Sequence, residues 1–352
     1  MLIKFLFKKG SFFLIVMAMF CFMGTSLIDA ADKQIVWKMQ TVSPSNSKEY
    51  KWMPEAFAKN VNLLSGGKIK IELHPAGALM SSSQVPEAVS KGILDCAHTY
   101  VSYFGGRVDG FNSASEWPFD AHPLQAVMWF YEGGGDEMMR EFGKPYNIYF
   151  LGVSPFLPEY VWSKKPIRTL EDLEGLKMRA QAVAGSMFKK LGASVVTMPG
   201  EEIYPALQRG IIDATEYLSI SANYDHNFYE VTDYIMGPTY SGGQSIDWIV
   251  NLKSWNKLSD ELKETVYLAL KATNFDYWNK AVPDEKAVFE KLKKEHNMTY
   301  YELPEEDVEA MFAARREAMK ERSADMPDYR RRINSQMKWA KEKLGYGTGK
   351  LE

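Results

Sequence analysis

The stretch that decides the fold is residues 161–219, VWSKKPIRTLEDLEGLKMRAQAVAGSMFKKLGASVVTMPGEEIYPALQRGIIDATEYLS. Apolar runs alternate here with helix-forming segments, and Gly192 and Gly210 supply the left-handed backbone that closes a helix. The expected elements are, in chain order, strand Leu176–Gln181, helix Gly185–Leu191, strand Ser194–Met198, helix Glu201–Arg209 and strand Ile211–Tyr217. This order predicts a mostly parallel sheet with helices on its faces.

Arg179 interrupts an apolar strand within this stretch. Ligands of such sheets bind at the carboxyl ends of the strands, where Arg179, Glu216 and Tyr217 are expected to emerge. A buried guanidinium needs an anion, and its planar fork suits a carboxylate. That anion is either a ligand or an internal acid, and Glu216 is either this internal partner or a ligand of a bound cation. The residues alone leave both alternatives open.

A shorter copy of the same pattern occurs earlier in the chain. Residues 88–96, AVSKGILDC, match residues 206–214, ALQRGIIDA, at four of nine positions, and most other positions are similar in character. Two similar α/β lobes facing each other would place His98-Thr99-Tyr100 opposite Glu216-Tyr217-Leu218. The alternative is that units of helix, glycine and strand look alike by chance. The repeat therefore predicts where a cleft would lie without establishing one.

Length and composition fit an exported globular protein. The chain has 352 residues, enough for two domains, and residues 1–30 resemble a secretory signal peptide with Lys4, Lys8 and Lys9 before the apolar run Phe12–Met23. The alternative is a retained membrane anchor, for which this run is short. Removing residues 1–30 changes the net charge from −3 to −5 and leaves Cys96 as the only cysteine. An intramolecular disulfide is then excluded, and no basic block indicates nucleic-acid binding.

The sequence favours a binding protein over an enzyme. It contains no H-E-x-x-H, G-x-S-x-G, C-x-x-C or phosphate-binding P-loop motif, and His98, His122, His226 and His296 lack metal-binding spacing. A hydrolase that uses Glu159 and Glu216 as paired carboxylates is the weaker alternative, because the sequence gives no distance between them.

The remaining elements join and cover the two expected lobes. Asn147–Val153 is predicted to lead from the first lobe into the second, and Ile246–Asn251 to cross back. Asp260–Glu290 is expected to form one or two long helices around Pro283. The last helix follows Pro327, and its apolar face, Tyr329, Ile333 and Met337, must cover either its own domain or a second subunit.

The segment LEDLEGLKMRA…LGASVVTMPGEEIYPALQRGIIDATEY resembles the core signature of the DctP-type solute receptors of tripartite ATP-independent periplasmic (TRAP) transporters. The resemblance covers nearly the whole chain after the signal peptide. It implies an α/β, two-lobed periplasmic binding protein fold with crossing strands, a hinge and long C-terminal helices. The implied boundaries are 31–154 plus about 246–284 for lobe I, 155–245 plus about 285–325 for lobe II, and 326–352 for the C-terminal helix.

Within that family, AHTYVSYF, WFYEGGG and IDATEY look most like the receptors for 2-oxoacids and lactate. The resemblance implies that Arg179 anchors the ligand carboxylate and that Glu216 and the Tyr217 carbonyl hold a sodium or calcium ion beside it. The glutamine that completes the cation site in some relatives has no match around 156–160, where Glu159 lies instead. Glu159 is therefore a further candidate cation ligand, and this departure favours a divalent ion. Tyr100 and Tyr103 correspond to ligand positions in the first lobe.

Two further departures narrow the expected ligand. Sialic-acid receptors of this family carry a second arginine close to position 159, which this chain lacks, and their ring-stacking aromatic residue falls at about Gly200. A 2-oxo or 2-hydroxy acid is therefore expected, with sugar acids, sulfonates and aromatic acids as alternatives.

The resemblance also implies a place and partners. A periplasmic receptor delivers its ligand to a small and a large membrane permease subunit for sodium-driven uptake, without catalysing a reaction. A sensor of the same fold that serves a signalling partner is the alternative. The face formed by Tyr329, Ile333 and Met337 permits a homodimer through the C-terminal helix.

Overall fold

A computed structural model describes residues 34–118, 122–240 and 244–345. The expected signal peptide, residues 1–30, lies outside this part of the chain. Among the described residues, none of the helices combines the length and the apolar character needed to cross a bilayer.

The first lobe is built on a five-stranded mixed sheet with the strand order β2-β1-β3-β10-β4. The strands are β1 (Ile35–Thr41), β2 (Ile69–His74), β3 (Cys96–Thr99), β4 (Ile148–Phe156) and β10 (Gln244–Asn251). β1 is parallel to β2 and β3, whereas β10 runs antiparallel to β3 and β4. Every residue of β10 is buried, as expected for a strand with neighbours on both edges and helices on its faces.

Helices cover this sheet. They are α2 (Lys48–Trp52), α3 (Pro54–Leu64), α4 (Val85–Lys91), α5 (Pro123–Glu132) and α6 (Gly135–Gly143). Gly92 closes α4 with a φ of 72°, a left-handed conformation that glycine adopts without strain. β3 therefore begins shortly after α4 and points its carboxyl end toward the second lobe.

The second lobe repeats this arrangement on a six-stranded sheet with the order β11-β9-β5-β8-β6-β7. Its strands are β5 (Tyr160–Ser163), β6 (Lys177–Arg179), β7 (Ser194–Val196), β8 (Ala214–Tyr217), β9 (Tyr234–Gly237) and β11 (Thr299–Glu302), and its helices include α7 (Ala182–Lys190), α8 (Ile203–Gln208) and α9 (Ile220–Asp225). The expected order of elements between 176 and 217 is present, although each strand is shorter than predicted and the last begins at Ala214.

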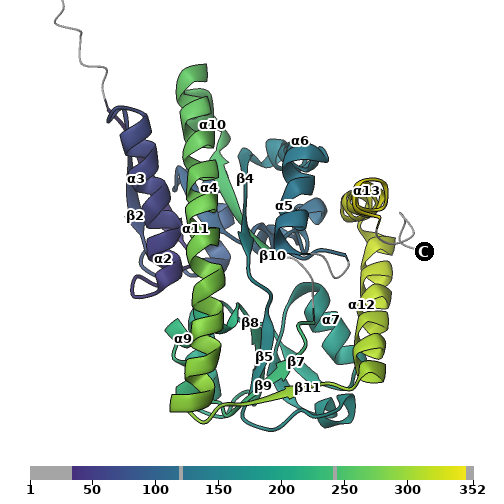
Figure 1. Ribbon diagram of the computed structural model, residues 1–352. Helices are drawn as coiled ribbons and strands as arrows, with labels where there is room; N and C mark the ends of the chain where they lie inside the picture. Colours follow the sequence, from purple (N-terminus) through teal and green to yellow (C-terminus); the bar gives the residue numbers. More distant parts are fainter. Residues whose placement is uncertain (1–33, 119–121, 241–243, 346–352) are drawn as a thin grey trace, which may run out of the picture.

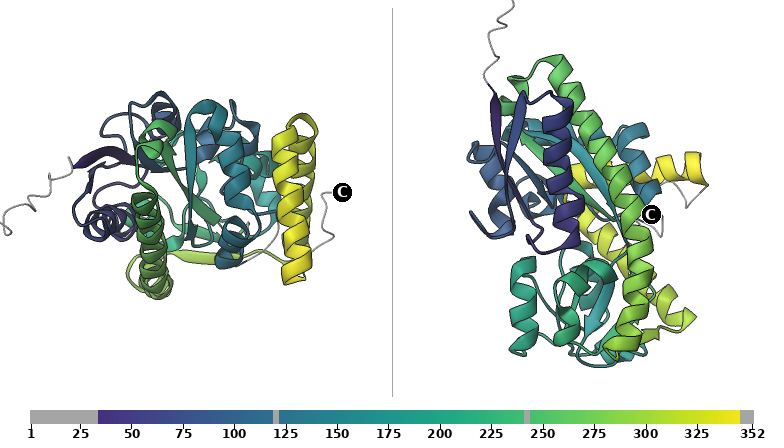
Figure 2. Two further views of the ribbon diagram at one scale, coloured as in Figure 1. Left: turned by 90° about the horizontal axis from the view of Figure 1, so that it is seen from above. Right: turned by 60° about the vertical axis from the view of Figure 1, so that its left-hand side comes forward.

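The chain passes between the lobes repeatedly. β4 leads into β5, and β10 returns after β9 to complete the first sheet. After α10 (Leu252–Asn256), α11 (Asp260–Glu295) is a single helix of 36 residues that packs against α3 of the first lobe and α9 of the second. Figures 1 and 2 show α11 running along both lobes. The two-lobed α/β fold with long C-terminal helices is confirmed, and the exact lobe boundaries stay a prediction.

Two more helices complete the chain on the opposite side of the molecule (Figure 1). α12 (Glu305–Asp325) packs on α7 of the second lobe, and α13 (Pro327–Leu344) returns to the first lobe against α6 and the turn Asp109–Phe111. Tyr329 and Ile333 of α13 are fully buried within the protein's own chain, with Met337 packed beside them. The first of the two expected uses of this face, cover for its own chain, is therefore observed.

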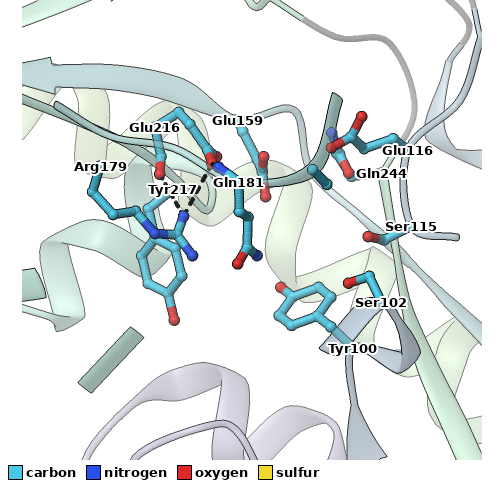
Figure 3. A pocket seen from close by; sticks show the side chains of 11 residues that line it. Tyr100, Ser102, Ser115, Glu116, Glu159, Arg179, Gln181, Glu216, Tyr217 and Gln244 are labelled. Atoms are coloured by element: carbon cyan, nitrogen blue, oxygen red, sulfur yellow. Dashed lines mark hydrogen bonds and ion pairs between the residues drawn. The ribbon is translucent and has the colours of Figure 1, made fainter. Parts of the chain in front are cut away.

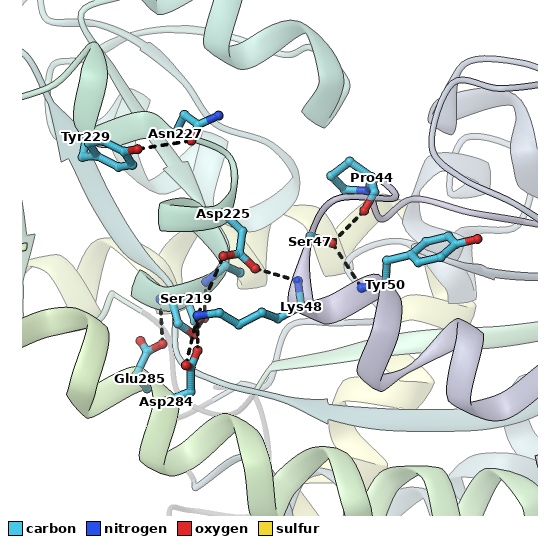
Figure 4. A network of polar contacts seen from close by, with 12 residues as sticks. Pro44, Ser47, Lys48, Tyr50, Ser219, Asp225, Asn227, Tyr229, Asp284 and Glu285 are labelled. Atoms are coloured by element: carbon cyan, nitrogen blue, oxygen red, sulfur yellow. Dashed lines mark hydrogen bonds and ion pairs between the residues drawn. The ribbon is translucent and has the colours of Figure 1, made fainter. Parts of the chain in front are cut away.

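Polar contacts, here called the closing contacts, hold the lobes against each other. The Lys48 backbone N–H donates to Asp225 Oδ2 at 2.7 Å, and Lys48 Nζ donates to Asp284 Oδ2 of α11 at 2.8 Å (Figure 4). At a second point the Ser82 backbone N–H donates to Glu201 Oε1 at 2.9 Å. Residues more than 100 positions apart in sequence therefore meet across the boundary between the lobes.

Candidate functional site

A pocket lies between the lobes, where the carboxyl ends of β3, β6 and β8 approach one another (Figure 3). The first lobe and β10 contribute Tyr100, Ser102, Ser115, Glu116 and Gln244, and the second lobe contributes Glu159, Arg179, Gln181, Ala182, Glu216 and Tyr217. The empty space, including its opening to solvent, is about 360 Å³.

Sheet register places the second-lobe residues together. Arg179 ends β6, which pairs in parallel with β8 so that Arg179 lies opposite Thr215. Glu216 and Tyr217 are the next residues of β8, and they emerge at the same sheet edge as the arginine. Tyr100 follows β3 in the first lobe and faces this edge across the pocket (Figure 3).

Arg179 is fully buried, and only part of its guanidinium is satisfied by the protein. Nε donates to the Met198 carbonyl at 3.2 Å, and Nη1 donates to the Glu216 carbonyl at 2.9 Å and to Glu216 Oε1 at 3.1 Å. Nη2 has no hydrogen-bond partner. The internal acid considered in the sequence analysis is therefore real and is Glu216, but it leaves one edge of the guanidinium unused. A buried donor without a partner costs free energy, so Nη2 is suited to an added anion.

Both carboxylate oxygens of Glu216 accept hydrogen bonds from the protein. Its Oε1 accepts from Arg179 and from the Gln181 backbone N–H at 2.8 Å, and its Oε2 accepts from the Tyr240 hydroxyl at 2.8 Å. The same hydroxyl contacts Glu159. Because a hydroxyl carries one hydrogen, it can donate to only one carboxylate at a time, and the second contact is satisfied when the other acid holds a proton.

Burial and the nearby charge of Glu216 raise the pKa of Glu159 to about 8, so Glu159 is the acid that keeps its proton most readily. Burial also raises the pKa of Glu216, although Arg179 opposes this effect. The two carboxyl groups therefore form a coupled pair with one hydroxyl between them. A cation bound beside Glu159 and Glu216 would displace the proton that one of them holds, and both carboxylates could then bind the cation directly.

These groups fit a hard cation in their chemistry. The local donors are carboxylate and carbonyl oxygens, which sodium and calcium prefer. Within the described ranges no group of three or more His, Cys, Asp or Glu side chains has metal-binding geometry. The Tyr217 carbonyl already accepts from Asn223 Nδ2 at 2.7 Å, which orients it. Glu159, Glu216 and the Tyr217 carbonyl are the residues that would hold such a cation, with a ligand filling its remaining positions.

Three tyrosines shape the rest of the pocket. The Tyr217 ring lies 5.2 Å from the Arg179 guanidinium, within cation–π range. Gly200 makes room for it, since a Cβ at this position would overlap the Tyr217 hydroxyl. Tyr103 does not line the pocket but packs edge-on against Tyr100 at 6.2 Å, and burial raises its pKa to about 12. Tyr103 is thus placed to position Tyr100, which does line the pocket.

Of the six predicted site residues, the structure brings Tyr100, Glu159, Arg179, Glu216 and Tyr217 to the pocket wall. Tyr103 is not among the lining residues, but it contacts Tyr100 and Gln181, which are. Sequence reasoning missed Ser102, Ser115, Glu116, Gln181, Gln244 and Tyr240. Gln181 could have been found, because it lies two positions after Arg179 at the end of the same strand. Glu116 and Tyr240 lie in irregular segments, where no periodic pattern shows which way a side chain points.

Comparisons with known proteins agree with this fold and site. Residues 39–325 match the DctP family, described as bacterial extracellular solute-binding protein, family 7, and the chain belongs to this family. A monocarboxylate 2-oxoacid-binding periplasmic protein from Nostoc sp. is 31% identical over 258 residues, which cover 73% of this chain and 71% of the relative. The family and its structural neighbours are solute receptors and not enzymes.

Two solved structures extend the comparison. A TRAP transporter solute-binding protein from Bordetella bronchiseptica, with calcium and picolinate in its site, is 27% identical at a TM-score of 0.80, and the match covers 89% of this chain and 93% of that one. A TRAP periplasmic solute-binding protein from Pseudoalteromonas atlantica, with bound sodium and pyruvate, is 25% identical at a TM-score of 0.80, and the match covers 89% and 98%.

Proposed function

We propose that this protein captures a small 2-oxo or 2-hydroxy monocarboxylate together with a cation and presents it to a TRAP permease for sodium-driven uptake. The observation that carries the proposal is the buried Nη2 of Arg179, which has no partner and lies near the two carboxyl groups, Glu159 and Glu216, that share the Tyr240 hydroxyl. The ligand carboxylate accepts from Nη2, and a cation held by Glu159, Glu216 and the Tyr217 carbonyl binds the ligand's second oxygen. Tyr100 closes the pocket from the first lobe, with Tyr103 supporting its ring.

The similar proteins support this assignment of ligand class. The Nostoc relative is named for monocarboxylate 2-oxoacids, and the two solved structures pair a carboxylate with calcium or sodium. Membership of this family supports a periplasmic location and delivery to two permease subunits. A homodimer through α13 is not part of the proposal, because the apolar face expected to form it covers the protein's own chain.

Isothermal titration calorimetry on the metal-stripped protein tests the proposal. We expect pyruvate or lactate to bind with micromolar affinity, about −8 kcal/mol, when calcium or sodium is present, and more weakly after chelation. Matched propanol and acetone serve as controls, since they lack the carboxylate that Arg179 recognises. Equal binding of the acids and these controls, or no binding of any 2-oxo or 2-hydroxy acid with either cation, would contradict it.

A further inference from the structure

The pocket holds a second unsatisfied charged group, Glu116, which the proposed carboxylate and cation sites do not use. Glu116 is 8% exposed, and its Oε2 has no hydrogen-bond partner. It lines the pocket from the first-lobe side together with Ser102 and Ser115, across from Arg179 (Figure 3). The pocket therefore has a guanidinium nitrogen without a hydrogen-bond partner at one end and a carboxyl oxygen without one at the other.

An unpartnered carboxylate oxygen is costly at this depth, because burial removes water without supplying a replacement donor. Backbone contacts explain why it stays there. Glu116 forms an isolated bridge with Gln244 of β10, which fixes the residue at the junction of the first sheet with the pocket. The Ala184 backbone N–H also hydrogen-bonds to this carboxyl group, and Oε2 is the oxygen that stays without a partner beside the pocket.

A structural role for Glu116 is the competing explanation. Arg315 of α12 is also buried, and its charge acts on Glu116. Arg315 Nη2 donates to the Trp117 carbonyl at 2.6 Å, whereas its Nε and Nη1 have no hydrogen-bond partner. Glu116 Oε2 therefore does not hydrogen-bond to either nitrogen. The ion pair with Arg315 that would give Glu116 a purely structural role is not formed.

Resting on the function proposed above, we propose that Glu116 selects acids that carry an O–H or N–H donor at the end remote from the carboxylate. Arg179 Nη2 takes the carboxylate, and Glu116 Oε2 accepts a hydrogen bond from a hydroxyl or ammonium group at the far end. The Ser102 and Ser115 hydroxyls line the same side and suit a polar substituent better than a methyl group. The physiological ligand is then a hydroxy- or amino-substituted acid rather than a simple 2-oxo acid such as pyruvate.

Matched ligands test the proposal on the unmodified protein. Hydroxypyruvate differs from pyruvate by one terminal hydroxyl, and the three-carbon series propionate, 3-hydroxypropionate and β-alanine ends in a methyl, a hydroxyl and an ammonium group. The four-carbon series butyrate, 4-hydroxybutyrate and 4-aminobutyrate covers a longer span. We expect the best donor-bearing acid to bind roughly ten- to a hundredfold more tightly than its matched methyl acid, as for a hydrogen bond to a charged group.

Variants of Glu116 test whether this residue causes the preference and whether the ligand's donor is a hydroxyl or an ammonium group. Glu116→Ala should bring the two affinities of a matched pair to within about threefold, because the acceptor is lost. Glu116→Gln keeps an acceptor oxygen but loses the charge, so it should abolish a preference for ammonium and retain part of a preference for hydroxyl. Asp136→Asn is the matched control, since Asp136 is a buried acid of the first lobe that pairs with Arg140 outside the pocket.

The outcomes separate this proposal from the function on which it rests. If the unmodified protein binds pyruvate with its cation but shows no preference for any donor-bearing acid, the Glu116 proposal is wrong and the receptor assignment stands. If the variants lower the melting temperature yet leave the preference intact, Glu116 serves Arg315 and the proposal is also wrong. If no acid of any series binds, both proposals fail. Should Glu116→Ala not fold, the comparison of matched ligands on the unmodified protein decides alone.

Discussion

The location of Arg179 could be predicted from the sequence, but its hydrogen-bond partners could not. Its place in an apolar strand of an α/β pattern was enough to predict a buried guanidinium at a strand end, and the structure confirms that location. The sequence could not predict that Nη1 of Arg179 donates to Glu216 while Nη2 has no partner, because this depends on the register of β6 against β8. Its role as a ligand anchor stays a prediction.

Replacing Arg179 tests that role. We expect Arg179→Ala to weaken carboxylate binding by roughly 2–5 kcal/mol, since it leaves the ligand charge and Glu216 buried without their partner. Arg179→Lys should recover only part of this loss, because the compact ammonium lacks the planar fork with which the guanidinium spans Met198, Glu216 and the ligand. Arg168→Lys, at an exposed position of the same lobe, is the control. Calorimetry that finds unchanged affinity in Arg179→Ala would refute the anchor.

Glu49 gives a second test at this scale, through pH. Burial raises the pKa of Glu49 to about 7, although the Ser43 hydroxyl donates to it at 2.7 Å and opposes that effect. Below the ordinary value of 4.5 both the folded and unfolded states hold the proton. Between 4.5 and about 7 the unfolded state releases a proton that the folded state keeps, so stability falls as pH rises.

We therefore expect the melting temperature of the ligand-free protein to fall between pH 5 and pH 8, and Glu49→Gln to flatten part of this slope. The amide keeps an acceptor for Ser43 but does not titrate. Glu72→Gln, on an exposed position of β2, should leave the slope unchanged. Identical pH profiles for Glu49→Gln and the unmodified protein would show that Glu49 is not a source of the effect.

At the scale of elements, the repeated unit of helix, glycine and strand was predictable because glycine marks its turn. Gly92 and Gly210 both adopt left-handed backbone, with φ of 72° and 69°, and the strands that follow them end at the pocket. Strand lengths were not predictable to the same degree. β7 is an edge strand paired only with β6, so it ends at Val196 although apolar residues continue beyond it.

The turn before α8 carries a prediction of its own. A Cβ at Gly200 would overlap the Tyr217 hydroxyl, and Tyr217 is 5% exposed. We expect Gly200→Ala to push this ring toward Arg179, to lower stability by roughly 1–3 kcal/mol and to weaken binding of the ligand. Gly106→Ala is the matched control, because a Cβ there meets nothing within 4 Å. Melting curves and calorimetry check both effects, and equal behaviour of the two variants would contradict the steric argument.

At the scale of the whole molecule, the two lobes were predictable from the repeat and the resemblance, but the contacts that close them were not. Glu201 and Asp225 reach across the boundary from segments with ordinary surface composition, and Asp284 holds Lys48 from the helix α11 that runs along both lobes. Such contacts depend on how two complete lobes are oriented, and no local pattern in the sequence records that orientation. Lobe closure around a ligand is the motion that these contacts would favour.

Removing one closing contact should weaken ligand binding without touching the pocket. In Glu201→Ala the Ser82 N–H and the Ser81 hydroxyl lose their acceptor, which sits at 2.9 Å and 3.2 Å. We expect a loss of roughly two- to tenfold in ligand affinity, because these exposed hydrogen bonds stabilise only the closed form. Glu202→Ala, at the adjacent exposed position, is the control. Small-angle scattering of the ligand-free variant should show a larger radius of gyration, and equal affinity in both variants would exclude a role for this contact.

The path of the chain also sets an order of events during synthesis. β10 lies between β3 and β4 in the first sheet, yet it is encoded after the whole of β5 to β9. The ribosome therefore releases strands β5 to β9 before β10 can take its place between β3 and β4. The second lobe still lacks α11, the edge strand β11 and the helix α12 that packs on α7 at that moment. The first sheet is consequently begun first but completed only after residue 251 has emerged.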